Sequence, residues 1–114
     1  MTTEATLASH LQELRRGTVV VASLTVLRMP GYGYSLLETL SQAGFEVEAN
    51  TLYPLLRRLE SQGLLTSSWN TDEARPRKFY TTTPQGDAIA DALRTEWARL
   101  DEAIGDLSTT DIKE

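Results

Sequence analysis

The chain has 114 residues, a net charge of −5 and no cysteine. This length suits one compact domain with a single core. The lack of cysteine excludes disulfides, thiolate metal sites and cysteine nucleophiles. The longest strongly apolar stretch, residues 18–27, is too short to span a bilayer, and residues 1–10 do not have the pattern of a signal peptide. We therefore expect a cytoplasmic protein without a membrane segment.

The acidic excess is confined to the last part of the chain. Residues 1–27 and 28–82 each carry equal numbers of acidic and basic side chains, whereas residues 83–114 carry three basic and eight acidic ones. Residues 49–82 are the most basic stretch, with five basic and three acidic groups. Because the placement of charge matters more than its sum, the middle of the chain remains compatible with a nucleic-acid partner, and the last segment does not.

The first half of the chain has the pattern of three helices. Apolar residues recur at helical spacing over residues 6–28, which predicts one long helix or two collinear ones, with Gly17 as a point where it can bend. Residues 33–44 predict a second, short helix that stops at Gly44. Residues 50–62 predict a third helix, with Asn50 as its N-cap and Gly63 as its stop.

The second half predicts a hairpin followed by a long helix. Residues 64–69 and 77–82 have strand patterns and are separated by polar turn residues. Trp69, near the end of the first strand, is expected to shield the hairpin from water. A last helix begins at Thr83-Pro84, since proline suits the first helical position. Its apolar residues recur at intervals of three and four, close to a heptad pattern: Ile89, Leu93, Trp97, Leu100, Ile104 and Leu107.

This order of elements predicts a mainly α fold with a β-hairpin wing, namely a winged helix-turn-helix with additional N-terminal and C-terminal dimerisation helices. Residues 1–82 would form the winged-helix DNA-binding domain with its helical extension, residues 83–107 the C-terminal dimerisation helix and residues 108–114 a disordered tail. In such a module the second helix of the pair enters the major groove, and the hairpin touches the neighbouring backbone.

The candidate DNA-binding residues lie on the third helix and the hairpin. At about 100° per residue, the leucines of the third helix share one face. The remaining surface offers amide, hydroxyl and guanidinium groups that can bond base edges and phosphates: Asn50, Thr51, Tyr53, Arg57 and Arg58. Arg75, Arg77 and Lys78 cluster at the tip and second strand of the hairpin, where they can contact phosphates. An ordinary solvated surface is the alternative interpretation of both groups.

Several of these segments together resemble the PadR family of transcriptional regulators. They are Gly33-Tyr34 with Leu36-Leu37, the run NTLYPLLRRLE over residues 50–60, Gly63-Leu64-Leu65, the run RKFY over residues 77–80, and TPQG over residues 83–86. The resemblance covers residues 17–107. The run of Thr-Leu-Tyr-Pro-Leu-Leu followed by Leu-Glu is its most specific part.

The resemblance implies a homodimer that binds pseudo-palindromic promoter DNA, usually as a repressor, and that pairs through a short C-terminal helix. At matching positions it points to Thr51, Tyr53 and Arg57 on the third helix, the reading helix that would enter the major groove. It also points to Arg77 and Lys78 on the wing. One departure is the pair Glu48-Ala49, where many members have Ser-Pro. An acid at the start of the reading helix could weaken a phosphate contact.

The remaining motifs do not indicate an enzyme. His10 is the only histidine, no Gly-rich phosphate loop follows a strand, and no serine, histidine and acid are suggestively arranged. We therefore expect no catalysis, no cofactor and no metal. Tyr34 is expected to pack beneath the third helix, and the alternative is that its hydroxyl reaches a phosphate. The main alternative function is a winged-helix protein–protein interaction module without DNA binding.

Trp97 lies in the apolar stripe of the last helix and has two interpretations. The simpler is packing against a second subunit. The other is an aromatic wall of a pocket for a small aromatic effector. The resemblance supports the second weakly, because some PadR-like proteins bind flat aromatic compounds at the dimer interface.

Overall fold

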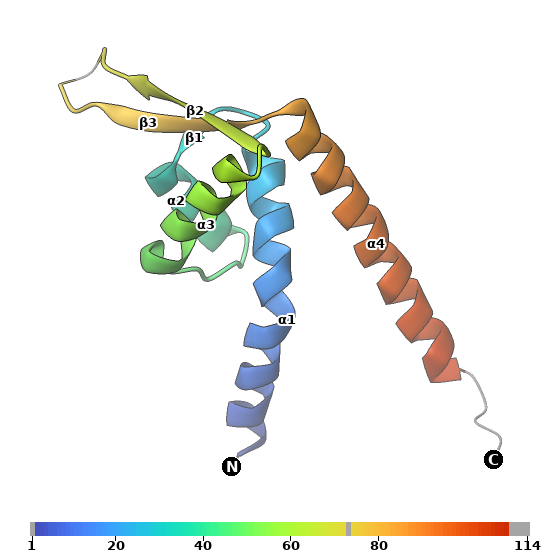
Figure 1. Cartoon of the computed structure of the whole chain (residues 1–114). Coiled ribbons are helices and arrows are strands. Elements are labelled where there is room, and N and C mark those ends of the chain that lie inside the picture. The colour runs from blue at the N-terminus through green and yellow to red at the C-terminus, as the bar shows by residue number, and fades with distance from the viewer. Residues whose placement is uncertain (1, 73, 110–114) are drawn as a thin grey trace.

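The computed structural model describes residues 2–72 and 74–109 (Figure 1). Its elements follow the order α1 (Thr3–Val26), β1 (Gly31–Tyr32), α2 (Gly33–Gln42), α3 (Ala49–Ser61), β2 (Leu65–Asn70), β3 (Arg77–Thr82) and α4 (Pro84–Thr109). The predicted mainly α fold with a hairpin wing is confirmed. Two helix starts and one strand differ from the expectation.

Helix α1 begins three residues before the predicted start. The hydroxyl of Thr2 caps it by accepting a 3.1 Å hydrogen bond from the Ala5 N–H, which satisfies one of the free donors of the first turn. The helix continues through Gly17 without interruption and ends at Val26, shortly before Pro30. Its buried residues all lie in its second half, so the first half projects away from the core.

The wing is a three-stranded antiparallel sheet rather than a two-stranded hairpin. Strands β2 and β3 pair from Leu65 opposite Thr82 to Asn70 opposite Arg77. Strand β1 adds to the other edge of β3, with Tyr32 opposite Phe79. A two-residue strand has no sequence period of its own, and its partner lies more than 45 residues away along the chain, so it was not predicted. It fixes the start of α2 to the wing.

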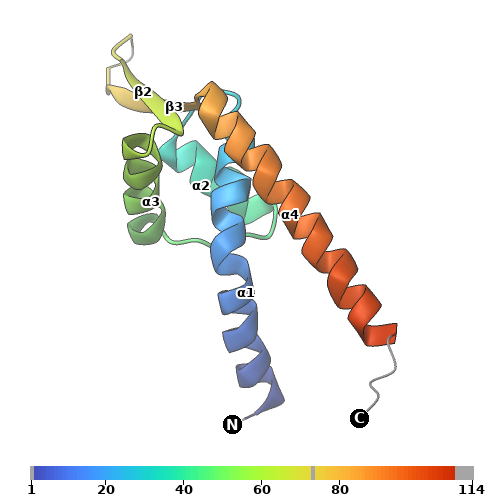
Figure 2. The same ribbon diagram turned by 45° about the vertical axis from the view of Figure 1, so that its right-hand side comes forward.

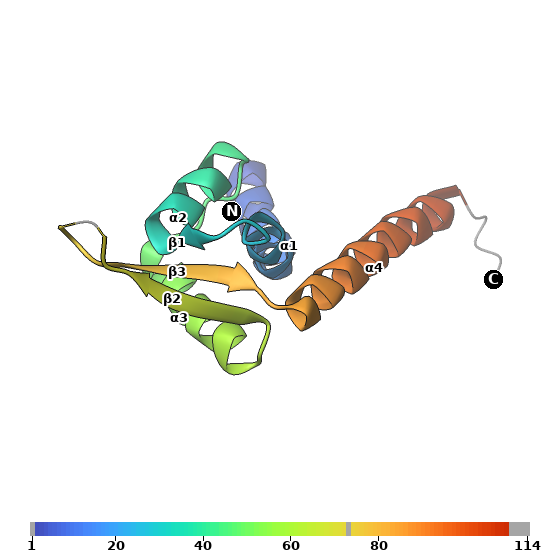
Figure 3. The same cartoon turned by 90° about the horizontal axis from the view of Figure 1, so that it is seen from above.

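The core lies where α1, α2 and α3 meet the sheet, which crosses one end of the helices (Figures 1 and 3). Leucines dominate it, and the three that form the buried stripe of α3 are Leu52, Leu56 and Leu59. Gly63, with a φ of +78°, ends the turn after α3 in the left-handed region that glycine adopts without strain. Leu64 and Leu65 then lead directly into the core from the start of the wing.

Helix α4 is anchored only at its beginning. A Cβ on Gly86 would lie 2.1 Å from the backbone oxygen of Leu64, so the first turn approaches the wing more closely than any side chain would permit. Arg28, just after α1, donates a 2.5 Å hydrogen bond to Asp91. Beyond that point α4 diverges from α1 (Figures 1 and 2).

The predicted tail begins inside the observed helix, because α4 runs to Thr109, and residues 110–114 lie outside the described part of the chain. Among the described residues, every helix is too short or too polar to cross a membrane.

Candidate nucleic-acid interface

Helix α3 begins earlier than the sequence indicated, and the prediction of Asn50 as its N-cap was wrong. The N-cap is Glu48, in an extended conformation and without a side-chain capping bond. Val47, the residue before it, packs against the core, and this tertiary contact sets where the helix starts despite the capping preference of asparagine. Pro54 therefore stands at the sixth helical position, where its missing N–H removes one hydrogen bond from the helix.

The outer face of α3 presents the five predicted residues to solvent: Asn50, Thr51, Tyr53, Arg57 and Arg58. Tyr53 is 37 % exposed, and its ring leans against the start of α2. A Cβ built on Gly33 would lie 2.3 Å from Cε1 of Tyr53, so the ring occupies the space that a side chain at position 33 would need. Gly33 thus sets the position of Tyr53.

Two of the three predicted wing cations are held by neighbouring groups. The Arg77 guanidinium lies 4.5 Å from the centre of the Tyr32 ring, which itself packs edge-on against Phe79. Lys78 places its Nζ 5.3 Å from the centre of the Tyr80 ring and 3.4 Å from Oε1 of Glu60. Both cations are half-buried, in contrast to Arg75 at the wing tip, which is exposed.

Glu60 connects α3 to the wing, a role that the sequence did not indicate. Its Oε2 accepts a hydrogen bond from the Ser67 hydroxyl on β2, and its Oε1 faces Lys78 on β3. The Ser67 hydrogen bond, helped by the charge of Lys78, lowers the pKa of Glu60 below its ordinary value. The carboxylate is therefore ionised at neutral pH and joins α3 to both wing strands.

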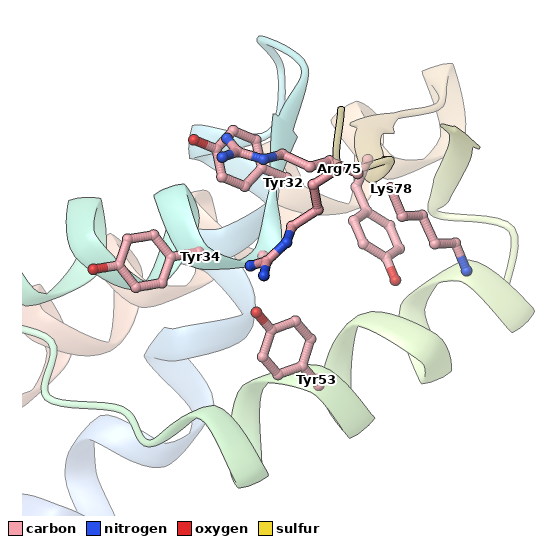
Figure 4. A pocket seen from close by; sticks show the side chains of 8 residues that line it. Tyr32, Tyr34, Tyr53, Arg75 and Lys78 are labelled. Carbon is pink, nitrogen blue, oxygen red and sulfur yellow. The ribbon is translucent and has the colours of Figure 1, made fainter. Parts of the chain in front are cut away.

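A hollow of about 590 Å³ lies between the starts of α2 and α3 and the wing (Figure 4). In the described part of the chain its lining comprises all four tyrosines, three cations and one glycine: Tyr32, Tyr34, Tyr53, Tyr80, Arg75, Arg77, Lys78 and Gly33. Arg75 extends from the wing into the space beside Tyr53, whose hydroxyl points towards it (Figure 4). The structure thus gathers Tyr53 and the three wing cations around one opening.

Two aromatic predictions were wrong. Tyr34 does not pack beneath α3 but is 60 % exposed on α2, where a hydrogen bond with Glu38 raises the pKa of its phenol. The ring against the start of α2 is that of Tyr53 instead. Trp69 is 64 % exposed, too much for the shielding role that was expected. Trp97 lies far along α4 from the hollow and is 60 % exposed.

Only part of the hollow could be inferred from the sequence. Tyr53, Arg75, Arg77 and Lys78 were candidates from the sequence, and the Tyr34 hydroxyl was an alternative phosphate contact. Tyr32, Gly33 and Tyr80 were not candidates. One feature of the sequence could have indicated them. Each tyrosine lies next to a glycine, in the basic strand over residues 77–82, or on α3. The register of β1 against β3 is what brings these segments together.

Comparison with known proteins agrees with this geometry. The sequence profile of the transcriptional regulator PadR-like family matches residues 23–92. Transcriptional regulator Rv3488 of Mycobacterium tuberculosis is 44 % identical over 71 residues, which cover 62 % of this chain and only 64 % of that protein.

Solved structures extend the likeness to nearly the whole chain. A PadR family transcriptional regulator from Eggerthella lenta is 45 % identical and has a TM-score of 0.89, with 95 % of this chain and 96 % of that chain covered. A PadR-like transcription factor from Bacteroides fragilis is 29 % identical with a TM-score of 0.72, covering 87 % and 98 % respectively. The chain therefore belongs to the PadR-like family of winged-helix, DNA-binding transcriptional regulators and is not an enzyme.

Proposed function

We propose that the chain is a homodimeric repressor that binds pseudo-palindromic double-stranded DNA through α3 and the wing. The observation that carries this proposal is the placement of the exposed polar face of α3 beside the cation-bearing strand β3, with Glu60 joining the two. One continuous surface thereby offers side chains for base edges and for phosphates. Repression follows if this surface occupies promoter DNA and excludes the transcription machinery.

Within this surface we assign Asn50, Thr51 and Arg57 to the base edges of the major groove. Arg57 is exposed on α3 opposite the buried leucines, and a guanidinium can bond both acceptors of a guanine. Arg58, Arg75, Arg77 and Lys78 are assigned to backbone phosphates. The net negative charge of the whole chain does not oppose this, because the acidic excess lies after residue 82 in the sequence.

The dimer rests on a second observation, the uncovered apolar face of α4. Its stripe residues are exposed in the single chain: Ile89, Leu93, Trp97, Leu100, Ile104 and Leu107. An isologous pair of such helices would cover both faces at once. We therefore assign residues 1–82 to DNA binding and residues 83–107 to dimerisation. Trp97 would lie in this interface, where its flat face could also contact a small aromatic effector.

The DNA-binding proposal is tested by selecting a preferred duplex from a random library and titrating binding against salt. A dimer that contacts phosphates should lose affinity steeply as salt rises. Arg57→Ala should cost about 1–3 kcal/mol on the selected duplex and much less on random DNA. Arg77→Ala should instead weaken both and flatten the salt dependence.

Arg99→Ala provides the matched control, because it removes the same charge from α4, where Arg99 pairs with Glu96 in its own helix. It should leave both affinities unchanged. Absence of salt-dependent DNA binding by the wild-type protein would contradict the proposal and favour a protein–protein interaction module. Equal losses on selected and random DNA would reassign Arg57 to a phosphate contact.

A further inference from the structure

The hollow between α2, α3 and the wing has a lining suited to an anion. Among the described residues, three of its side chains are cations and four are phenols, and none is a carboxylate. Two of these lining residues also contact acids outside the lining: Lys78 faces Glu60 of α3, and Tyr34 interacts with Glu38 of α2. The described lining therefore offers an occupant cationic and phenolic hydrogen-bond donors.

The three cations of the hollow differ in where they direct their hydrogen-bond donors. Arg77 lies over the Tyr32 ring, and Lys78 is directed along α3 towards Glu60. Arg75 instead projects into the opening, where its guanidinium and the Tyr53 hydroxyl approach each other from opposite walls (Figure 4). These two groups are the donors that converge on the space between the helices and the wing.

The shape of the hollow favours a group carried by a polymer over a free small molecule. Small-molecule sites enclose most of their ligand. This hollow instead opens to solvent, and three cations and four phenols contribute to its described lining. A phosphate is compact, carries several acceptor oxygens and matches the geometry of a guanidinium.

We propose that the hollow holds one phosphate of the DNA backbone, bonded by the Arg75 guanidinium and the Tyr53 hydroxyl. This inference rests on the proposed DNA-binding function and extends the interface to the start of α2. Gly33 is a positioning residue: it makes no contact with DNA itself, but its lack of a side chain leaves room for the Tyr53 ring. The backbone of Gly33 has a negative φ, so alanine is sterically permitted there except for its collision with Tyr53.

The first test is a double-mutant cycle between Gly33 and Tyr53, measured as affinity for the selected duplex. Gly33→Ala and Tyr53→Ala should each weaken binding by about fivefold or more, the loss expected from one hydrogen bond. Combined, the two substitutions should weaken it no further than Tyr53→Ala alone, because Gly33 acts through the ring. Losses that multiply would overturn the positioning role.

The second test separates the charged donor from the neutral one. Arg75→Ala should reduce the slope of log affinity against log salt by about 0.9 for each hollow. Tyr53→Phe should lower affinity about fivefold at every salt concentration and leave the slope unchanged. Tyr53→Phe retains the ring, so it keeps the test valid if Tyr53→Ala fails to fold.

Tyr34→Phe compares a second phenol of the same lining, one that interacts with Glu38. Its loss of DNA affinity should be smaller than that of Tyr53→Phe, and an equal loss in the two variants would overturn the assignment to Tyr53. Arg99→Ala, which removes a cation from α4, is the control and should leave DNA affinity unchanged.

The source of the phosphate is tested with inorganic pyrophosphate and adenosine monophosphate at constant ionic strength. If either binds the DNA-free protein through Arg75 while Arg75→Ala leaves DNA affinity intact, the hollow serves a free anion and the proposal is overturned. Failure of the wild-type protein to bind DNA would remove the proposed function as well. Normal DNA binding by Tyr53→Phe and Arg75→Ala would remove only this inference.

Discussion

Helices α3 and α4 carry apolar stripes of the same spacing, yet the two stripes have opposite environments. Leu56 in the middle of α3 is 0 % exposed, whereas Ile104 in α4 is 65 % exposed. The difference lies in what each helix packs against. Helix α3 is held between α2 and the wing, while α4 is anchored by its first turn and then leaves the core. Apolar periodicity therefore indicates which residues share a face of a helix, and it does not indicate whether the same chain covers that face.

The largest expected effect comes from creating a cavity in the buried stripe of α3. Leu56→Ala should lower the free energy of unfolding by about 2–5 kcal/mol, because it removes buried methyl groups and leaves a cavity. Urea unfolding measures this loss, at a protein concentration where the wild type and the variant are equally dimeric. Gln42→Ala, on the exposed end of α2, should stay within about 0.5 kcal/mol. A small loss for Leu56→Ala would mean that the two stripes are packed alike.

A substitution in the exposed stripe of α4 should have a somewhat smaller effect. It changes the free energy of dimerisation rather than the free energy of unfolding. Ile104→Glu should weaken dimerisation by about 2–4 kcal/mol, since symmetry places the charge in the apolar interface twice. Sedimentation over a range of concentrations measures this. Thr95→Glu adds the same charge on the opposite face of α4 and should not alter association. A wild-type protein that sediments as a monomer at micromolar concentration would contradict the dimer.

The smallest effect concerns Trp97, the one large aromatic side chain of the open stripe. If a planar aromatic compound contacts Trp97 at the dimer interface, it should change DNA affinity about fivefold, a coupling of about 1 kcal/mol. Trp97→Leu should abolish this response with the dimer intact. Fluorescence is measured in a Trp69→Phe background, because Trp69 is the other tryptophan of the chain and its emission would overlap that of Trp97. Unchanged Trp97 emission and DNA affinity with a panel of such compounds would restrict Trp97 to packing.

Most of the helical architecture could be predicted from the sequence. The stripe of α3, the stop at Gly63 and the proline at the start of α4 are local signals, each set by contacts within one or two turns. The strands of the hairpin were predicted within one residue because they are adjacent in the chain. The start of α3 was not, since Val47 packs against the core and overrides the preference of Asn50 for the N-cap.

The candidate site divides in the same way. The sequence by itself determined the family, the helical and strand segments, and the concentration of basic groups between residues 49 and 82, because periodicity and composition are local properties. Tertiary structure alone decided that β1 pairs with β3, that Tyr53 rests on Gly33, and that Glu60 connects α3 to the wing. These contacts join residues that are 7 to almost 50 positions apart, and no local pattern specifies them. The hollow forms only because folding brings these distant residues together.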